Sequence, residues 1–120
     1  MNVRSLIAVA VFSVIVVAVS PRFSSAAVES IKGEVVDLGC YLGHGGAGSD
    51  HQECAQKCIK NGLPVGIKTD GGVYIAVNAE HGAANSVLAS LAGKRVTADG
   101  EISERDGMKL IAVKKVTPQD

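Results

Sequence analysis

The sequence predicts one small, mainly β domain, with one or two short helices and five strands arranged as a partly open barrel. Three observations favour this fold class. The chain has 120 residues, which is enough for one domain and too few for two. Short runs rich in β-branched residues recur along it, separated by glycine-rich turns. Aromatic residues make up only 3% of the chain, so the core of the domain is expected to be aliphatic.

The first half of the domain is expected to contain one strand, one loop and one helix. Residues 31–38 form a β-rich run and predict the first strand. Residues 39–50 include five glycines, which predicts a long, flexible surface loop. Asp50 is a suitable N-cap for a helix over residues 51–61, and basic side chains lie in the last turn of that helix, where the helix dipole favours them.

The second half is expected to form two hairpins. Residues 64–69 and 73–78 are joined by an Asp-Gly-Gly turn. Residues 94–103 and 108–116 alternate between apolar and polar positions and are joined by Glu-Arg-Asp-Gly, which makes them the second hairpin. Between the two hairpins, residues 83–91 predict a short helix or turn. Together with the first strand, these runs supply the five strands of the barrel.

Residues 1–27 have the features of a secretory signal peptide. Arg4 precedes an apolar run over residues 6–19, which as a helix spans roughly 21 Å and falls short of the ~30 Å hydrocarbon core of a bilayer. The small residues at positions 24–27 suit a signal peptidase, so we expect cleavage after Ala27 and a mature domain over residues 28–120. An uncleaved signal anchor is the alternative. Export predicts a bacterial periplasmic or secreted protein in an oxidising space.

Charge and composition exclude one class of partner. Loss of residues 1–27 removes two arginines and leaves ten basic and twelve acidic side chains, a net charge of about −2. Such a domain has no basic surface to neutralise phosphates, and it has few rings on which bases could stack. Nucleic acid is therefore not an expected partner. No Ser-His-Asp or paired-carboxylate pattern is present either, so the sequence does not indicate an enzyme.

The chemically distinctive segment holds all three cysteines and two of the three histidines. On the predicted helix, His51, Cys54 and Cys58 point within about 60° of one another. Cys40 follows the first strand and can meet them if the glycine-rich loop folds back. Thiolates with one imidazole suit Zn²⁺, and thiolates alone suit Cu(I). The predicted metal ligands are therefore Cys40, Cys54 and Cys58, with His51 as the better-placed fourth ligand and His44 as its alternative.

Two other hypotheses explain the same cysteines. In an oxidising space Cys40 could form a disulfide with Cys54 or Cys58, which would link the helix to the strand and leave one spare thiol. Such a bond would stabilise the folded domain by roughly 2 to 4 kcal/mol. In a thiol–disulfide exchange protein, Cys54 would be the nucleophile, because it lies in the first turn of its helix, where the dipole lowers a thiol pKa. Asp37 is expected to be a solvated carboxylate at the strand end, with orientation of an imidazole as its alternative role.

Two segments carry a resemblance to known proteins. Residues 91–113 resemble the last hairpin of exported bacterial proteins with an OB-fold-like barrel. Residues 33–41, from Gly-Glu-Val-Val-Asp to Cys-Tyr, and residues 51–58, His-Gln-Glu-Cys-Ala-Gln-Lys-Cys, are similar to a group of small uncharacterised exported bacterial proteins. The resemblance implies an OB-like barrel carrying a Cys/His cluster, and it implies no activity.

The hypothesis that we carry forward is an exported binding protein that holds a transition-metal ion, Zn or Cu, through the Cys/His cluster. A protein partner that receives the ion is left open, and no stable membrane anchor is expected after cleavage. A disulfide-stapled interaction domain and a thiol–disulfide exchange protein are the alternatives. All three depend on the three sulfur atoms converging in the folded chain.

Overall fold

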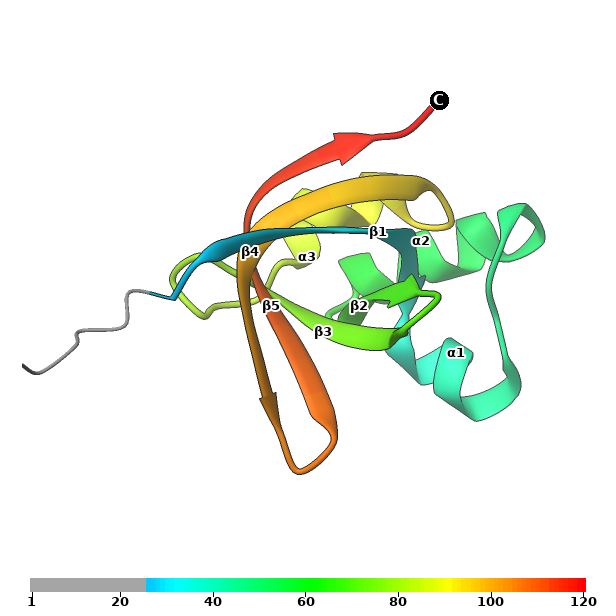
Figure 1. Ribbon diagram of the computed structural model, residues 1–120. Coiled ribbons are helices and arrows are strands. Elements are labelled where there is room, and N and C mark those ends of the chain that lie inside the picture. The colour runs from blue at the N-terminus through cyan, green and yellow to red at the C-terminus, as the bar shows by residue number, and fades with distance from the viewer. Residues whose placement is uncertain (1–25) are drawn as a thin grey trace, which may run out of the picture.

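The five strands pair in a closed ring in this computed structural model, which describes residues 26–120 (Figure 1). The order around the ring is β1-β2-β3-β5-β4. All neighbours are antiparallel except β3 and β5, which run parallel. The small five-stranded barrel predicted from the sequence is confirmed, and it is closed rather than partly open. The strands are β1 (Val28–Asp37), β2 (Val65–Thr69), β3 (Gly72–Asn78), β4 (Arg95–Arg105) and β5 (Met108–Pro118).

The signal peptide predicted over residues 1–27 lies outside the described residues up to position 25. Within residues 26–120, none of the helices has both the length and the apolar character needed to cross a bilayer.

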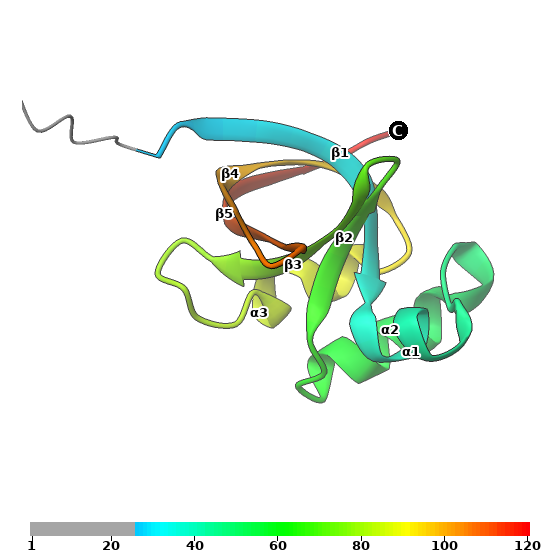
Figure 2. The same ribbon diagram turned by 60° about the horizontal axis from the view of Figure 1, so that its bottom comes forward.

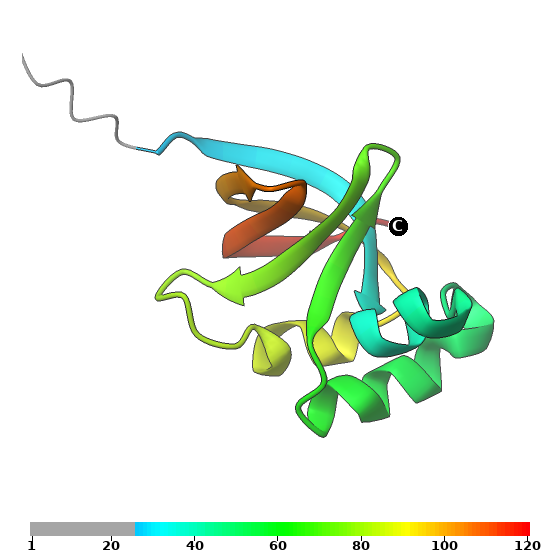
Figure 3. The ribbon, with the colours of Figure 1, turned by 90° about the horizontal axis from the view of Figure 1, so that it is seen from below.

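The helical segments gather outside the barrel wall. Figures 2 and 3 show α1 and α2 next to each other, just beyond the end of β1. α2 contacts β1 and the short helices that precede β4. The helical segments are α1 (Leu38–His44), the 3₁₀ turn η1 (Ser49–His51), α2 (Gln52–Lys60), α3 (Asn85–Leu88) and the 3₁₀ turn η2 (Ala89–Leu91).

The prediction of a loop over residues 39–50 is wrong at its start, because residues 38–44 form α1. Glycines weaken this short helix, but a cap at each end stabilises it. Asp37 caps its N-terminus, and Gly45 ends it with φ of 75°, a left-handed conformation that glycine adopts without strain. The predicted N-cap of α2 is also wrong. Asp50 lies within η1, and the residue at the N-cap position of α2 is His51, whose side chain makes no capping bond.

The core is aliphatic, as the composition predicts. Its fully buried members include Val35, Ile67, Val96 and Ile111 from four strands. α2 contributes Ala55 and Ile59, and α3 contributes Leu88. Burying these side chains gives roughly 1.5–3 kcal/mol for each large one, so the inner face of α2 is held firmly against the barrel. The rest of α2, including its two cysteines, is therefore carried at a defined position outside the core.

Closure of so small a barrel requires a strand to come unusually close to its neighbour at Gly100. The β4–β5 register shifts between Asp99 and Gly100, which marks a bulge in the pairing. A Cβ atom built at Gly100 would clash with the carbonyl oxygen of Ala112 on β5. Any larger residue at this position must therefore push the two strands apart.

We expect Gly100→Ala to lower the free energy of unfolding by about 1–3 kcal/mol, the usual cost of forcing extra atoms into a packed site. Urea unfolding followed by circular dichroism measures it. Gly71→Ala is the matched control, because a Cβ atom at Gly71 meets only the Thr69 hydroxyl at 3.8 Å. Equal stability of the two variants would contradict a tight closure at Gly100.

Candidate metal centre

Asp37 positions Cys40. Its carboxylate accepts hydrogen bonds from the backbone N–H of Gly39 at 2.9 Å and of Cys40 at 3.3 Å, and it is fully buried. The next residue, Leu38, donates its N–H to the Pro64 carbonyl at 2.9 Å. The first turn of α1 is therefore tied to the end of β1 and to the segment before β2. The prediction of a solvated Asp37 is wrong, because this carboxylate is needed as a helix cap.

The loop after α1 returns the chain toward the barrel. Gly45 and Gly46 donate their N–H groups to the carbonyls of Tyr41 and Cys40, which closes the last turn of α1. The N–H of Gly48 then donates to the carboxylate of Glu34 on β1. This bond anchors the loop to the barrel wall, three residues before His51. The fold-back that the sequence hypothesis required is thus fixed by one hydrogen bond, from the Gly48 N–H to a carboxylate on β1.

Asn85 secures the other end of α2. Its side-chain amide donates to the carbonyl of Ile59 and to that of Leu63, each at 2.7 Å. Carbonyls at a helix C-terminus lack partners within the helix, so a side chain that satisfies them from another element fixes the helix end. α2 is held by Asn85 at its C-terminus and by its buried inner face along its length. Its cysteines therefore have little freedom to move relative to α1.

The three sulfur atoms converge. Cys40 on α1 and Cys54 and Cys58 on α2 form one group whose sulfur atoms all lie within 4.8 Å of one another. All three are free thiols in this structure. Cys54 is exposed, and Cys40 and Cys58 are half-buried. The predicted convergence of the three cysteines, which required the glycine-rich segment to fold back, is therefore confirmed, and it joins two separate helices.

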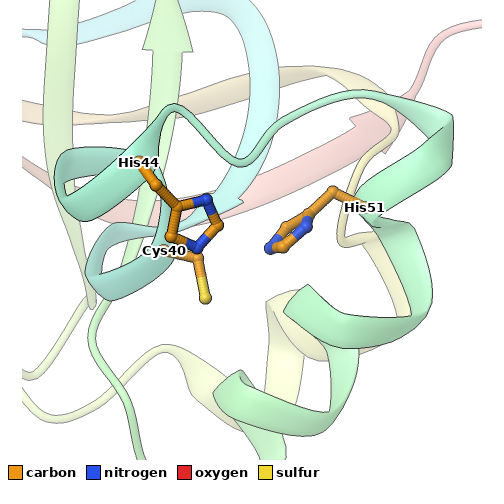
Figure 4. A group of neighbouring side chains, drawn as sticks. All are labelled: Cys40, His44 and His51. Atoms are coloured by element: carbon orange, nitrogen blue, oxygen red, sulfur yellow. The ribbon is translucent and has the colours of Figure 1, made fainter.

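A second group contains the two histidines. One ligand atom each from Cys40, His44 and His51 lies within the same 4.8 Å limit. The two imidazole rings meet edge to face, with 5.5 Å between their centroids. Figure 4 shows the His51 ring pointing toward Cys40 and His44, which lie one turn apart on α1. The Nε2 atom of His51 is buried and has no hydrogen-bond partner.

All five residues predicted as ligands belong to these two groups, and Cys40 belongs to both. The division differs from the predicted ligand set. The sequence hypothesis placed His51 with the three cysteines, because His51, Cys54 and Cys58 share a helical stripe. His51 instead lies before α2, in the 3₁₀ turn η1, and its group contains His44 and Cys40. The third histidine, His81, is exposed in the turn after β3 and has no part in either group.

The surroundings of Cys40 and Cys58 favour protonated thiols at these two positions in the absence of a cation. A hydrogen bond to Asp37, burial and the negative charge of Asp37 raise the pKa of the Cys40 thiol to about 12. Burial and the neighbouring Cys54 and Asp37 raise the pKa of Cys58. Burial disfavours the charged form of Asp37, but hydrogen bonds from the Cys40 thiol, the two capping N–H groups and the Cys58 thiol outweigh it and lower its pKa. Asp37 therefore influences the thiols of Cys40 and Cys58, whereas the alternative sequence interpretation paired it with an imidazole.

Three residues that shape the site escaped the sequence analysis. Glu34, Asn85 and Gly46 act through contacts with residues distant in the sequence or across a loop. Nothing in their local sequence signals this. Gly46 packs against the His51 imidazole so closely that a Cβ atom there would lie 2.7 Å from Nε2.

The chain was compared with protein families, with curated proteins and with solved structures, and none of the three comparisons found a match. The geometry of the Cys/His cluster is therefore the basis of the functional argument.

We expect Asp37→Ala to lower the free energy of unfolding by about 1–2 kcal/mol, because α1 loses its cap. Asp37→Asn keeps an oxygen that can accept one of the two backbone N–H groups, so its loss should be smaller. Urea unfolding measures both. The control is Asp70→Ala in the exposed β2–β3 turn, which should stay within ~0.5 kcal/mol of the parent protein. An Asp37→Ala protein as stable as this control would show that the cap does not hold α1 in place.

Proposed function

We propose that this protein is an exported binding protein that holds a transition-metal ion, Zn²⁺ or Cu(I), through the sulfur atoms of Cys40, Cys54 and Cys58. The observation that carries the proposal is the approach of these three atoms to within 4.8 Å of one another, from two helices that are each fixed to the barrel. Three thiols that are not bonded to one another and share one small volume are a ligand set for a soft or borderline cation.

The distances suit a metal ion after small side-chain adjustments. Sulfur atoms bound to zinc at ~2.3 Å in a tetrahedron lie roughly 3.8 Å apart. The upper limit of 4.8 Å is about 1 Å longer, which rotation of a cysteine side chain can supply. A bound ion replaces the protons of the three thiols, so the raised thiol pKa values make binding release protons and weaken as the pH falls. It would also link α1 to α2 and stabilise a domain with a small core.

Exposure of the site favours transfer of the ion over permanent storage. Cys54 is exposed, so an incoming ligand can reach the ion without unfolding the domain. Three protein sulfurs leave the fourth tetrahedral position to another ligand, which a partner protein could supply. We include delivery to such a partner in the proposal, together with a periplasmic or secreted location after removal of the leader.

The same geometry supports a second candidate function. Cys40 lies close to both cysteines of α2. In an oxidising compartment it could form a disulfide with one of them and leave the other as a thiol. A protein in that state would be a stapled domain, or a thiol–disulfide exchange protein if the bond is readily reduced. The metal proposal and this candidate differ in the number of thiols and in the bound mass.

We expect the protein expressed from the full chain, purified without oxygen, to carry at least one bound ion in native mass spectrometry after incubation with Zn²⁺ or with Cu(I). The same spectrum reports whether the leader has been removed. A chain that binds neither ion while its three thiols are reduced would rule out the proposal.

Cys40→Ser should abolish binding at the sulfur group, because serine is a much weaker ligand for these ions and Cys40 is the only sulfur donor on α1. Titration against a chromophoric chelator measures the loss. His81→Asn is the matched control, since it removes a histidine outside the cluster at a positive φ that asparagine tolerates. Equal loss in both variants would place the ion elsewhere.

Thiol titration of the protein under denaturing conditions, after metal removal without reductant, separates the two candidate functions. The metal proposal expects three reactive thiols in the exported protein. A single reactive thiol together with no metal uptake would favour the disulfide-stapled domain.

A further inference from the structure

We propose that the cluster binds two divalent ions, with the Cys40 thiolate bridging them. One ion is held by Cys40, Cys54 and Cys58, and the other by Cys40, His44 and His51. This inference rests on the proposed metal-binding function and extends it, because it assigns the histidine group a metal site of its own.

The first support is the position of Cys40 between the two groups. Each group brings three ligand atoms within 4.8 Å of one another, and the only residue common to both is Cys40. A single ion could take the sulfur group or the histidine group completely, but each choice leaves two good donors unused a few ångströms away. A thiolate sulfur has lone pairs for two metal ions, so one bridging cysteine uses all five donors.

The second support is the environment of His51. Its Nε2 atom is buried without a hydrogen-bond partner, and such a group costs free energy unless a ligand satisfies it. The ring is also held in place, because Gly46 lies directly against it. Figure 4 shows the imidazole directed at Cys40 and His44. A second metal ion in this group would give the buried Nε2 atom of His51 a partner. It would also explain why the loop carries glycine at position 46, where a larger residue would displace the ring.

The third support is the balance of charge. Metal-bound cysteines are thiolates, so a loaded sulfur group carries three negative charges. Asp37 is fully buried beside two of these cysteines and adds a fourth. One divalent ion leaves two negative charges in a half-buried cluster, whereas two divalent ions neutralise it. Neutral imidazoles add ligands to the second ion without changing that balance.

Each proposed ion has three protein ligands, which leaves one tetrahedral position open on each. The alternative that the experiment must separate is a single ion with the three cysteines and one imidazole. That arrangement would require His51 or His44 to approach the cysteines of α2, with which neither histidine is grouped.

The stoichiometry of Zn²⁺ binding tests the inference. We expect two ions per chain in native mass spectrometry of the anaerobically purified protein, and one ion in His44→Ala, whose side chain is exposed and lies outside the core. Gly46→Ala should also bind one ion, because its methyl group displaces the His51 ring. Gly43→Ala is the matched control: a Cβ atom there meets nothing within 4 Å, so this variant should keep both ions.

Cadmium NMR of the protein loaded with Cd²⁺ tests the bridge itself. Two cadmium resonances are expected, and the β protons of Cys40 should correlate with both, whereas those of Cys58 should correlate with one. One resonance, or one Zn²⁺ per chain in the parent protein, would overturn the inference and leave the proposed function standing. Two ions retained in His44→Ala would overturn it as well. No bound ion at all would contradict both proposals.

Discussion

The arrangement of the cluster depends on one buried carboxylate. Asp37 ends β1 and caps α1, and its negative charge raises the pKa values of the Cys40 and Cys58 thiols. A carboxylate fully removed from water is costly unless several donors satisfy it. Here two backbone N–H groups donate to it, those of Gly39 and Cys40, so the carboxylate that ends β1 also positions Cys40. The fold and the candidate site therefore share a single electrostatic centre.

The remaining parts of the site follow from how the two helices are attached. Glu34 holds the loop before η1 against β1, and Asn85 holds the end of α2. Ile59 and Ala55 bury the inner face of that helix. None of these contacts uses the side chain of a cysteine or a histidine, so the candidate ligands are not needed to hold the two helices in place. This separation between scaffold and candidate ligands is consistent with the proposed metal site.

Much of the fold could be predicted from local sequence, and the failures have a common cause. Both hairpins and α2 followed from periodicity and turn residues that act within a few positions. The helix α1 could not be predicted in this way, because the glycines at positions 39 and 43 favour a loop. The helix is stabilised by the Asp37 cap and by the hydrogen bond from Leu38 to the Pro64 carbonyl. Helical spacing predicted that Cys54 and Cys58 share one face of α2, whereas the approach of Cys40 was predicted only on the condition that the glycine-rich segment folds back. The pairing of His51 with His44 was not, since it depends on how a glycine-rich loop turns back.

The order in which the chain is made has a consequence for its thiols. β1 is synthesised before its partner β4, so Ser30 cannot pair with Asp99 until β4 has been made. The ring cannot close until β5 has emerged, because β5 joins β3 to β4, and such dependence on distant contacts slows folding. All three cysteines are synthesised before β5. The three thiols are therefore exposed on an unclosed chain for an interval, and both the proposed metal ion and the alternative disulfide could be acquired before the barrel forms.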